Sequence, residues 1–212
     1  MNSHTERRLI VGPAGLIECA IDWPAEAVEG TASSARRGLA LICHPLPTHG
    51  GTLDNKVVQT LARTFVQLGY RALRFNFRGV GQSEGAWDAG QGEIDDALAV
   101  LAALRDPAEP LVLAGFSFGG YVVSQVAERL SADQKALRLV LVGPATSRFD
   151  TAQVPANTLV IHGEQDDVVP LSSVLDWARP QSLPITVVPG TGHFFHGQLP
   201  LLKQIVLSNW QD

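Results

Sequence analysis

A serine in the run GFSFGG (Gly115–Gly120) has the neighbours that a nucleophile requires. Ser117 is the middle residue of a Gly-x-Ser-x-Gly pattern, which lies between the apolar run PLVLAGF and a helical pattern. A tight strand-to-helix turn pushes such a hydroxyl out of the end of a sheet, and it leaves the Phe118 N–H free to bind an anionic oxygen. A small serine in a glycine-rich turn is the alternative, but the strand–turn–helix setting favours a catalytic nucleophile.

A histidine and an acid that can activate this serine follow later in the chain. A serine hydroxyl is a poor nucleophile at neutral pH and needs a base that a third group orients. The run LVIHGEQDDVVP places Asp166 in the loop after one apolar strand, and the run VVPGTGHFFH places His193 after the next. We therefore predict a catalytic triad of Ser117, His193 and Asp166.

Each of the last two assignments has a rival close by. Asp167 lies beside Asp166 and is expected to point elsewhere, capping a turn before VVP. His196 competes with His193 as the base, and the GTGH turn directly after the strand favours His193. A third histidine, His162, lies at the end of an apolar strand, where we expect a packed, hydrogen-bonded side chain rather than a catalytic one.

Short apolar runs alternate with helical patterns along most of the chain. The first two runs predict an antiparallel hairpin at a sheet edge, and the later runs are nearly continuous in apolar residues, which is typical of a parallel sheet covered on both faces. We predict a mostly parallel, twisted sheet of about eight strands, with a polar loop over 24–38. The expected strands are 7–11, 16–23, 38–43, 70–77, 110–116, 137–143, 157–163 and 184–190, and the expected helices are 55–69, 92–106, 119–130, 172–180 and 199–210. Ligands bind at the carboxyl ends of such strands, where all three predicted triad residues fall.

The motifs and their order resemble those of the α/β-hydrolases over nearly the whole chain. The match includes GFSFGG, the order Ser–Asp–His and the run RFNFRGVGQSEG (Arg74–Gly85), which is similar to a strand and R-G-x-G-x-S turn that shapes the loop beside the nucleophile. Members often carry Asp where this chain has Asn76. More narrowly, HPLPTHGG followed by TLDNKVVQ resembles a bacterial subgroup of small α/β-hydrolases that usually read H-P-H-P-x-x-G-G, so that Leu46 replaces the second histidine.

The loop HPLPTHGG is expected to supply the second donor of an oxyanion hole. The resemblance implies that this donor comes from the loop after the third strand, which is this run. Proline has no N–H, so Pro45 and Pro47 cannot donate, and the Leu46 N–H lies between them. We therefore predict the N–H groups of Leu46 and Phe118 as the oxyanion donors. His44 is expected to hold the loop in place by hydrogen bonds.

Neither a metal nor an organic cofactor is expected. A metal site needs about three protein ligands, and this loop offers only His44 and His49, with rigid proline backbone between them. Cys43 beside His44 is expected to be a buried thiol rather than a nucleophile, and Cys19 likewise.

The segment 144–157 (PATSRFDTAQVPAN) has no helical period and is too short to form a cap domain. We therefore expect an open site for a small-molecule acyl substrate, and hydrolysis of carboxylic esters or thioesters through an acyl-enzyme. The expected lining is Leu46, Thr48, His49, Trp87, Phe118, Phe149, Phe194 and Phe195. A peptidase, an acyltransferase or a perhydrolase with the same triad, a catalytically silent ligand-binding protein and a structural role remain alternatives.

Composition is consistent with one domain spanning residues 1–212. Hydrophobic residues make up 45% of the chain and charged residues 17%, with a net charge of −5. No stripe of basic residues favours nucleic acid, and no apolar run approaches the roughly 18 residues of a spanning helix. The N-terminal run lacks the pattern of a signal peptide, and we expect a cytoplasmic protein.

Overall fold

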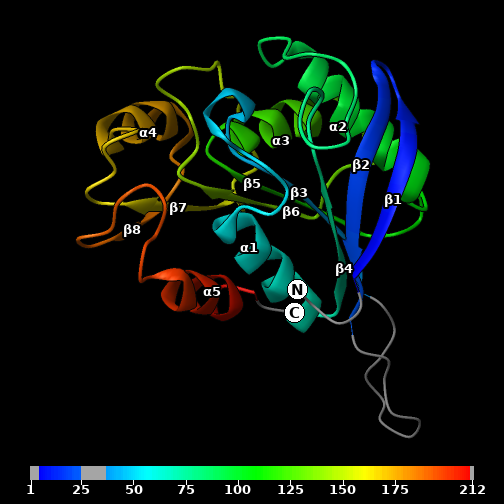
Figure 1. Cartoon of the computed structure of the whole chain (residues 1–212). Helices are drawn as coiled ribbons and strands as arrows, with labels where there is room; N and C mark the ends of the chain where they lie inside the picture. The colour runs from blue at the N-terminus through cyan, green and yellow to red at the C-terminus, as the bar shows by residue number, and fades with distance from the viewer. Residues whose placement is uncertain (1–4, 25–36, 211–212) are drawn as a thin grey trace, which may run out of the picture.

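The computed structural model describes residues 5–24 and 37–210 and arranges them around one sheet (Figure 1). Its eight strands follow the order β1-β2-β4-β3-β5-β6-β7-β8. The strands are β1 (Thr5–Gly12), β2 (Gly15–Asp22), β3 (Gly38–Cys43), β4 (Tyr70–Phe75), β5 (Leu111–Phe116), β6 (Arg138–Val142), β7 (Leu159–Gly163) and β8 (Ile185–Val188). The predicted polar loop 24–38 lies almost entirely outside the described residues.

The sheet is antiparallel at its N-terminal edge and parallel elsewhere. β1 and β2 form the predicted hairpin, and β2 also pairs antiparallel with β4. The pairs from β4 through β3, β5, β6 and β7 to β8 are all parallel. The carboxyl ends of β3, β5, β6, β7 and β8 therefore meet at one edge of the sheet, as the sequence predicts.

Helices cover both faces of the sheet. They are α1 (Lys56–Gln67), α2 (Gln91–Leu104), α3 (Phe118–Arg129), α4 (Leu171–Ala178) and α5 (Leu199–Ser208). Figure 1 shows α1 and α5 together on one side of the sheet and α2 and α3 on the other. The buried residues divide accordingly, because α1 and α5 share one apolar cluster while α2, α3 and α4 contribute to the second. The predicted architecture of an α/β sheet with two covered faces is confirmed.

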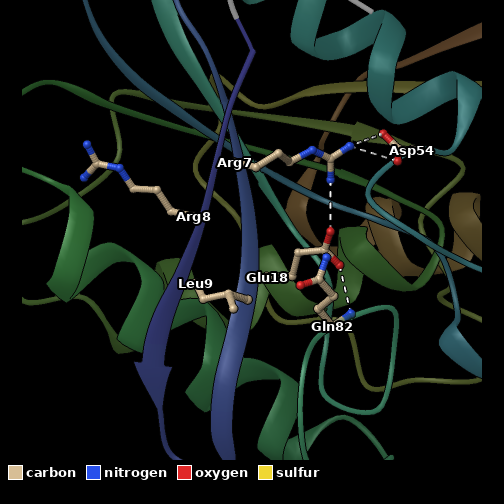
Figure 2. Close-up of a pocket in the computed structure, with 6 residues that line it drawn as sticks. All are labelled: Arg7, Arg8, Leu9, Glu18, Asp54 and Gln82. Carbon is tan, nitrogen blue, oxygen red and sulfur yellow. Dashed lines mark hydrogen bonds and ion pairs between the residues drawn. The ribbon is translucent and has the colours of Figure 1, made fainter.

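A network of charged side chains ties the hairpin to the segment that follows HPLPTHGG. Figure 2 shows Arg7 of β1 bridging Glu18 of β2, at 3.2 Å, and Asp54, at 3.1 Å. Arg74 of β4 bonds Asp22 at 2.8 Å and the Leu53 carbonyl oxygen, also at 2.8 Å. The loop before α1 is therefore held by Arg7 of the hairpin and by Arg74 of β4.

The connection between β6 and β7 contains no helix among its described residues, 143–158. A cap domain in this position is built from helices, so the prediction that the site has no cap is confirmed. No helix in the described ranges is long and apolar enough to cross a membrane.

Candidate active site

Ser117 occupies a strained turn between β5 and α3. Its backbone has φ 55° and ψ −117°, a region that residues other than glycine rarely adopt. The two flanking glycines allow this turn because a Cβ on Gly115 would lie 2.2 Å from the Gly119 carbonyl oxygen, and one on Gly119 would lie 2.2 Å from the Cys43 carbonyl oxygen. Strand, turn and helix are therefore packed so closely that only glycine fits on either side of the serine.

Asp166 and His193 form a buried hydrogen-bonded pair. His193 Nδ1 lies 2.7 Å from Asp166 Oδ2, while Asp166 Oδ1 accepts the N–H groups of Val168, at 3.0 Å, and Val169, at 2.7 Å. Burial opposes the charge on Asp166, but the hydrogen bonds from His193 and Val169 outweigh it and hold the pKa of this carboxyl below its ordinary value. An ionised Asp166 accepts a hydrogen bond from His193 Nδ1–H, which leaves His193 Nε2 available to another group.

The serine and this pair lie at the same edge of the sheet. The His193 ring packs against Phe116, the residue before Ser117, with ring centroids 4.9 Å apart. The Ser117 N–H donates to the Val142 carbonyl at 2.9 Å, and a Cβ on the next residue, Gly143, would lie 3.4 Å from the His193 ring. Within the described residues Ser117 Oγ makes no hydrogen bond to His193 Nε2. Such bonds are often long in unliganded enzymes and tighten when substrate binds.

The rival residues take no part in the hydrogen bond of this pair. Asp167 and His196 are both exposed, and the His196 ring stacks on Phe194 instead of meeting Asp166. His162 is buried, with Nε2 3.0 Å from the Val169 carbonyl oxygen, which is the packed and hydrogen-bonded state expected for it. Of the histidines considered for the base, His193 makes the short bond to Asp166.

His44 orients a peptide of the HPLPTHGG loop. Its Nε2 accepts the Phe77 N–H at 3.1 Å, so Nδ1 carries the proton and donates to the Pro45 carbonyl at 2.7 Å. That carbonyl belongs to the same planar trans peptide as the Leu46 N–H, which therefore points the opposite way. Burial lowers the pKa of His44 to about 3, so the ring stays neutral. The prediction that His44 holds this loop by hydrogen bonds is confirmed.

The N–H of Leu46 and the N–H of Phe118 at the start of α3 have no acceptor in the described part of the chain. The HPLPTHGG loop starts against α3, because a Cβ on Gly119 would lie 2.8 Å from the His44 carbonyl oxygen. These groups are the two predicted oxyanion donors, and both remain free to bind one.

An aromatic cluster lies beside Phe118. The Phe118 ring lies 5.1 Å from Trp87 and 4.9 Å from Phe149, measured between ring centroids, and half-buried Leu46 packs against the same apolar cluster. Glu93 of α2 holds the backbone that follows Trp87, because its carboxylate accepts the N–H groups of Asp88 and Gly90. Two of the expected lining residues, Trp87 and Phe149, thus contact the residue that follows the predicted nucleophile.

The other expected lining residues divide into two groups. Phe194 is 44% exposed and packs edge-on against the His193 ring at 5.1 Å, while Thr48 and His49 are exposed in a short 3₁₀ turn of the HPLPTHGG loop. Phe195 differs from the expectation: its side chain is fully buried in the apolar cluster beneath α1 and α5. Its backbone has a positive φ of 52°, which turns the ring away from the site.

Both cysteines are free and buried, as expected. Burial raises the pKa of Cys19 to about 12 and raises that of Cys43 further, so neither is a thiolate at neutral pH. No group of three or more His, Cys, Asp or Glu side chains in residues 5–24 and 37–210 is arranged to hold a metal ion.

Residues 41–157 match the family model of the alpha/beta hydrolase fold, and the chain belongs to this family. A protein from Xanthomonas campestris, described as an a/b serine hydrolase without lid, is 37% identical, with a TM-score of 0.84 over 99% of this chain and 94% of its own. An alpha-beta serine hydrolase homologue from Coxiella burnetii is 38% identical, with a TM-score of 0.81 over 100% of this chain and 99% of its own. An uncharacterised protein of Rickettsia prowazekii (strain Madrid E) is 31% identical over 188 residues, which cover 81% of this chain and 79% of that protein.

The fold and these relatives support a hydrolase. The lidless description of the Xanthomonas structure agrees with the helix-free connection between β6 and β7. The narrower resemblance, to a subgroup defined by the HPLPTHGG loop, stays a prediction.

Proposed function

We propose that the protein is a serine hydrolase that cleaves carboxylic esters or thioesters through an acyl-enzyme. The observation that carries this proposal is the buried hydrogen bond of 2.7 Å between His193 and Asp166, beside the turn that holds Ser117. A serine on a strained strand-to-helix turn, with an oriented histidine at the same sheet edge, is the arrangement that acyl transfer requires.

In the first half of the reaction Ser117 Oγ attacks the acyl carbonyl carbon while His193 Nε2 takes its proton. Asp166 stabilises the imidazolium that forms, and the N–H groups of Leu46 and Phe118 bind the oxyanion. The tetrahedral intermediate collapses when the bond to the alcohol or thiol breaks, and the leaving group receives the proton from His193. The products of this half are the free alcohol or thiol and an ester of Ser117.

In the second half water attacks that ester and His193 takes one of its protons. The intermediate collapses, the proton returns to Ser117 Oγ, and the carboxylic acid leaves. The free N–H groups of Leu46 and Phe118 support the same oxyanion role in both halves, because the developing charge lies on the same oxygen atom.

The substrate is a small molecule with an apolar acyl or leaving group. Half-buried Trp87 and Phe149 and exposed Phe194 supply apolar walls, and Thr48 and His49 supply a polar rim. The connection from β6 to β7 has no helices that would enclose a long chain, so the site is accessible from solvent.

Labelling with a fluorophosphonate tests the nucleophile, and a substrate panel tests the reaction. The wild-type protein should gain the mass of one phosphonyl group, and Ser117→Ala should gain none, whereas equal labelling of both would remove Ser117 from its role. A panel of matched ester, thioester and amide substrates, with and without hydroxylamine as a competing nucleophile, should show ester or thioester cleavage in water. Cleavage of the amide alone, or turnover only with the added nucleophile, would instead indicate a peptidase or an acyltransferase.

A further inference from the structure

His162 is a buried histidine that the proposed reaction does not use. It lies near the end of β7 and its side chain is fully buried. Nε2 lies 3.0 Å from the Val169 carbonyl oxygen and 3.6 Å from Asp166 Oδ2. A carbonyl oxygen only accepts hydrogen bonds, so Nε2 carries the proton, and Nδ1 is left as a bare acceptor. Within the described residues this Nδ1 has no hydrogen-bond partner.

A buried nitrogen without a partner is unfavourable, and an aliphatic side chain would fill this position without that cost. Burial lowers the pKa of His162, although Asp166 and the Val169 carbonyl act in the opposite direction. The ring is therefore neutral, and it acts on its surroundings through the dipole of its Nε2–H group and not through a charge.

Two hydrogen bonds connect His162 to the acid of the site. Val169 donates its N–H to Asp166 Oδ1 and accepts the His162 Nε2–H at its carbonyl, so that Val169 bridges the two side chains. The positive end of the His162 Nε2–H dipole thereby lies near Asp166 Oδ2, the oxygen that also accepts from His193 Nδ1. Both histidines thus act on one carboxylate oxygen.

We propose that His162 is a positioning residue that sets, through Asp166, the pH at which His193 becomes available as a base. Its N–H dipole takes up part of the negative charge on Oδ2, which reduces the stabilisation of a protonated His193. An aliphatic residue at position 162 would leave the full charge of Oδ2 to the hydrogen bond from His193. The catalytic consequence rests on the proposed function, but the effect on the hydrogen bond between His193 and Asp166 does not.

Among the groups around Asp166 and His193, His162 is the one placed to change the charge on Asp166 Oδ2. The titratable groups that act on His162 are Asp166 and His193, and those that act on Asp166 are the two histidines. The neighbouring acids of the loop, Glu164 and Asp167, are exposed, and β8 and α4 pack against this part of β7 with apolar residues.

Two substitutions separate the N–H dipole from the packing of the ring. His162→Leu removes both nitrogens and fills the space, while His162→Gln retains an N–H donor that can reach the Val169 carbonyl. Thr158→Val is a matched control, because Thr158 Oγ1 is also buried without a partner but lies at the opposite end of β7. If His162→Leu does not fold, His162→Met removes the donor with a more adaptable side chain.

The direct readout is the proton resonance of His193 Nδ1–H in the resting protein, followed by the pH profile of kcat/KM. In His162→Leu the resonance should move downfield, since the hydrogen bond from His193 to Oδ2 strengthens when the competing N–H dipole is lost. The acid limb of the profile should move up by about half a pH unit, which lowers kcat/KM on that limb about threefold while the plateau changes less than about twofold. His162→Gln should return the resonance and the acid limb most of the way to their wild-type positions. Thr158→Val should shift neither.

An unchanged His193 resonance and an unchanged acid limb in His162→Leu would overturn the proposal and leave His162 as a packing residue. Equal shifts in Thr158→Val would do the same, because they would trace the effect to strand packing. A shifted resonance in a protein that hydrolyses no ester or thioester would support the positioning role and count against the proposed function instead.

Discussion

His44 Nδ1 donates a hydrogen bond of 2.7 Å to the Pro45 carbonyl, and this bond sets the direction of the Leu46 N–H. The loop therefore uses its buried histidine to orient a backbone peptide. The tautomer that makes this possible is fixed by the Phe77 N–H, which donates to the other ring nitrogen at 3.1 Å. The side chain at position 46 is not needed for this role, which needs only the backbone N–H of that residue.

Gly51→Ala should impair catalysis because Gly51 backs the same peptide. A Cβ at this position would lie 2.0 Å from the Pro45 carbonyl oxygen, so the peptide has to move and its N–H turns away from the oxyanion. We expect kcat to fall by roughly tenfold to several hundredfold, as for the loss of one oxyanion donor, measured with p-nitrophenyl acetate.

Gly50→Ala is the matched control for this substitution. A Cβ on Gly50 meets nothing within 4 Å, but its φ of +78° makes alanine unfavourable by about 1 kcal/mol. Its kcat should therefore stay near the wild-type value. Equal losses of kcat in both variants would indicate general damage to the loop and not displacement of the Leu46 N–H.

The buried, neutral state of His44 makes stability depend on pH. The folded pKa of about 3 is below the ordinary value, so between these values the unfolded chain binds a proton that the folded chain does not. The stability that neutral His44 contributes is therefore fully present above the ordinary histidine pKa, and it is lost as the pH falls toward the folded value. The slope from this residue reaches about 1.4 kcal/mol per pH unit.

Urea unfolding between pH 7 and 5 measures this slope. His44→Gln should show a smaller dependence on pH than the wild type across that interval, although it is less stable throughout. His49→Gln, which changes an exposed histidine of the same loop, should keep the wild-type slope. A wild-type slope in His44→Gln would mean that His44 is not held neutral in the fold.

Asn76 is adapted to Glu18 in this chain. The Asn76 amide accepts the Leu53 N–H at 2.9 Å through Oδ1 and donates to Glu18 Oε2 at 2.7 Å through Nδ2. Aspartate at this position would keep the first bond but set a second carboxylate against Glu18. Asn76→Asp should therefore lower the free energy of unfolding by about 1–3 kcal/mol at neutral pH.

A double-mutant cycle tests this pairing. Glu18→Gln supplies an amide donor, and the variant that carries both substitutions should recover most of the stability that Asn76→Asp loses, measured by urea unfolding. Losses that simply add would show that the repulsion between residues 18 and 76 is not the cause.

The order of elements and the sheet edge that carries the site were predictable from the sequence, because each apolar run ends in a turn and each candidate residue follows one. The tautomer of His44 was not, since it depends on Phe77, which is 33 positions away and lies in the loop after β4. The role of Glu18 beside Asn76 was hidden for the same reason.

Phe195 shows a different limit of sequence reasoning. It is next to Phe194 and two residues beyond His193 in the chain. Apolar residues beside a candidate base suggest a lined pocket. The positive φ of Phe195 instead turns its ring into the core, while Phe194 stays exposed. Local sequence indicated two aromatic residues here but not the backbone turn that separates them.

Paired substitutions test the choice of base and acid. His193→Ala should lower kcat/KM on p-nitrophenyl acetate by several orders of magnitude, because it removes the ring that bonds Asp166, while exposed His196→Ala should change it little. Asp166→Asn should likewise cost far more than Asp167→Asn. The reverse ranking in either pair would exchange the assigned residue for its neighbour.

We propose Ser117 as the nucleophile of an acyl-transfer reaction. The kcat of Ser117→Ala on p-nitrophenyl acetate measures this role. Thermal unfolding should show that the variant folds normally, since the hydroxyl makes no hydrogen bond within the described residues. If Ser117 is the nucleophile, kcat falls by several orders of magnitude, as removal of a triad serine does elsewhere. A folded Ser117→Ala protein with wild-type kcat would show that another group attacks the substrate.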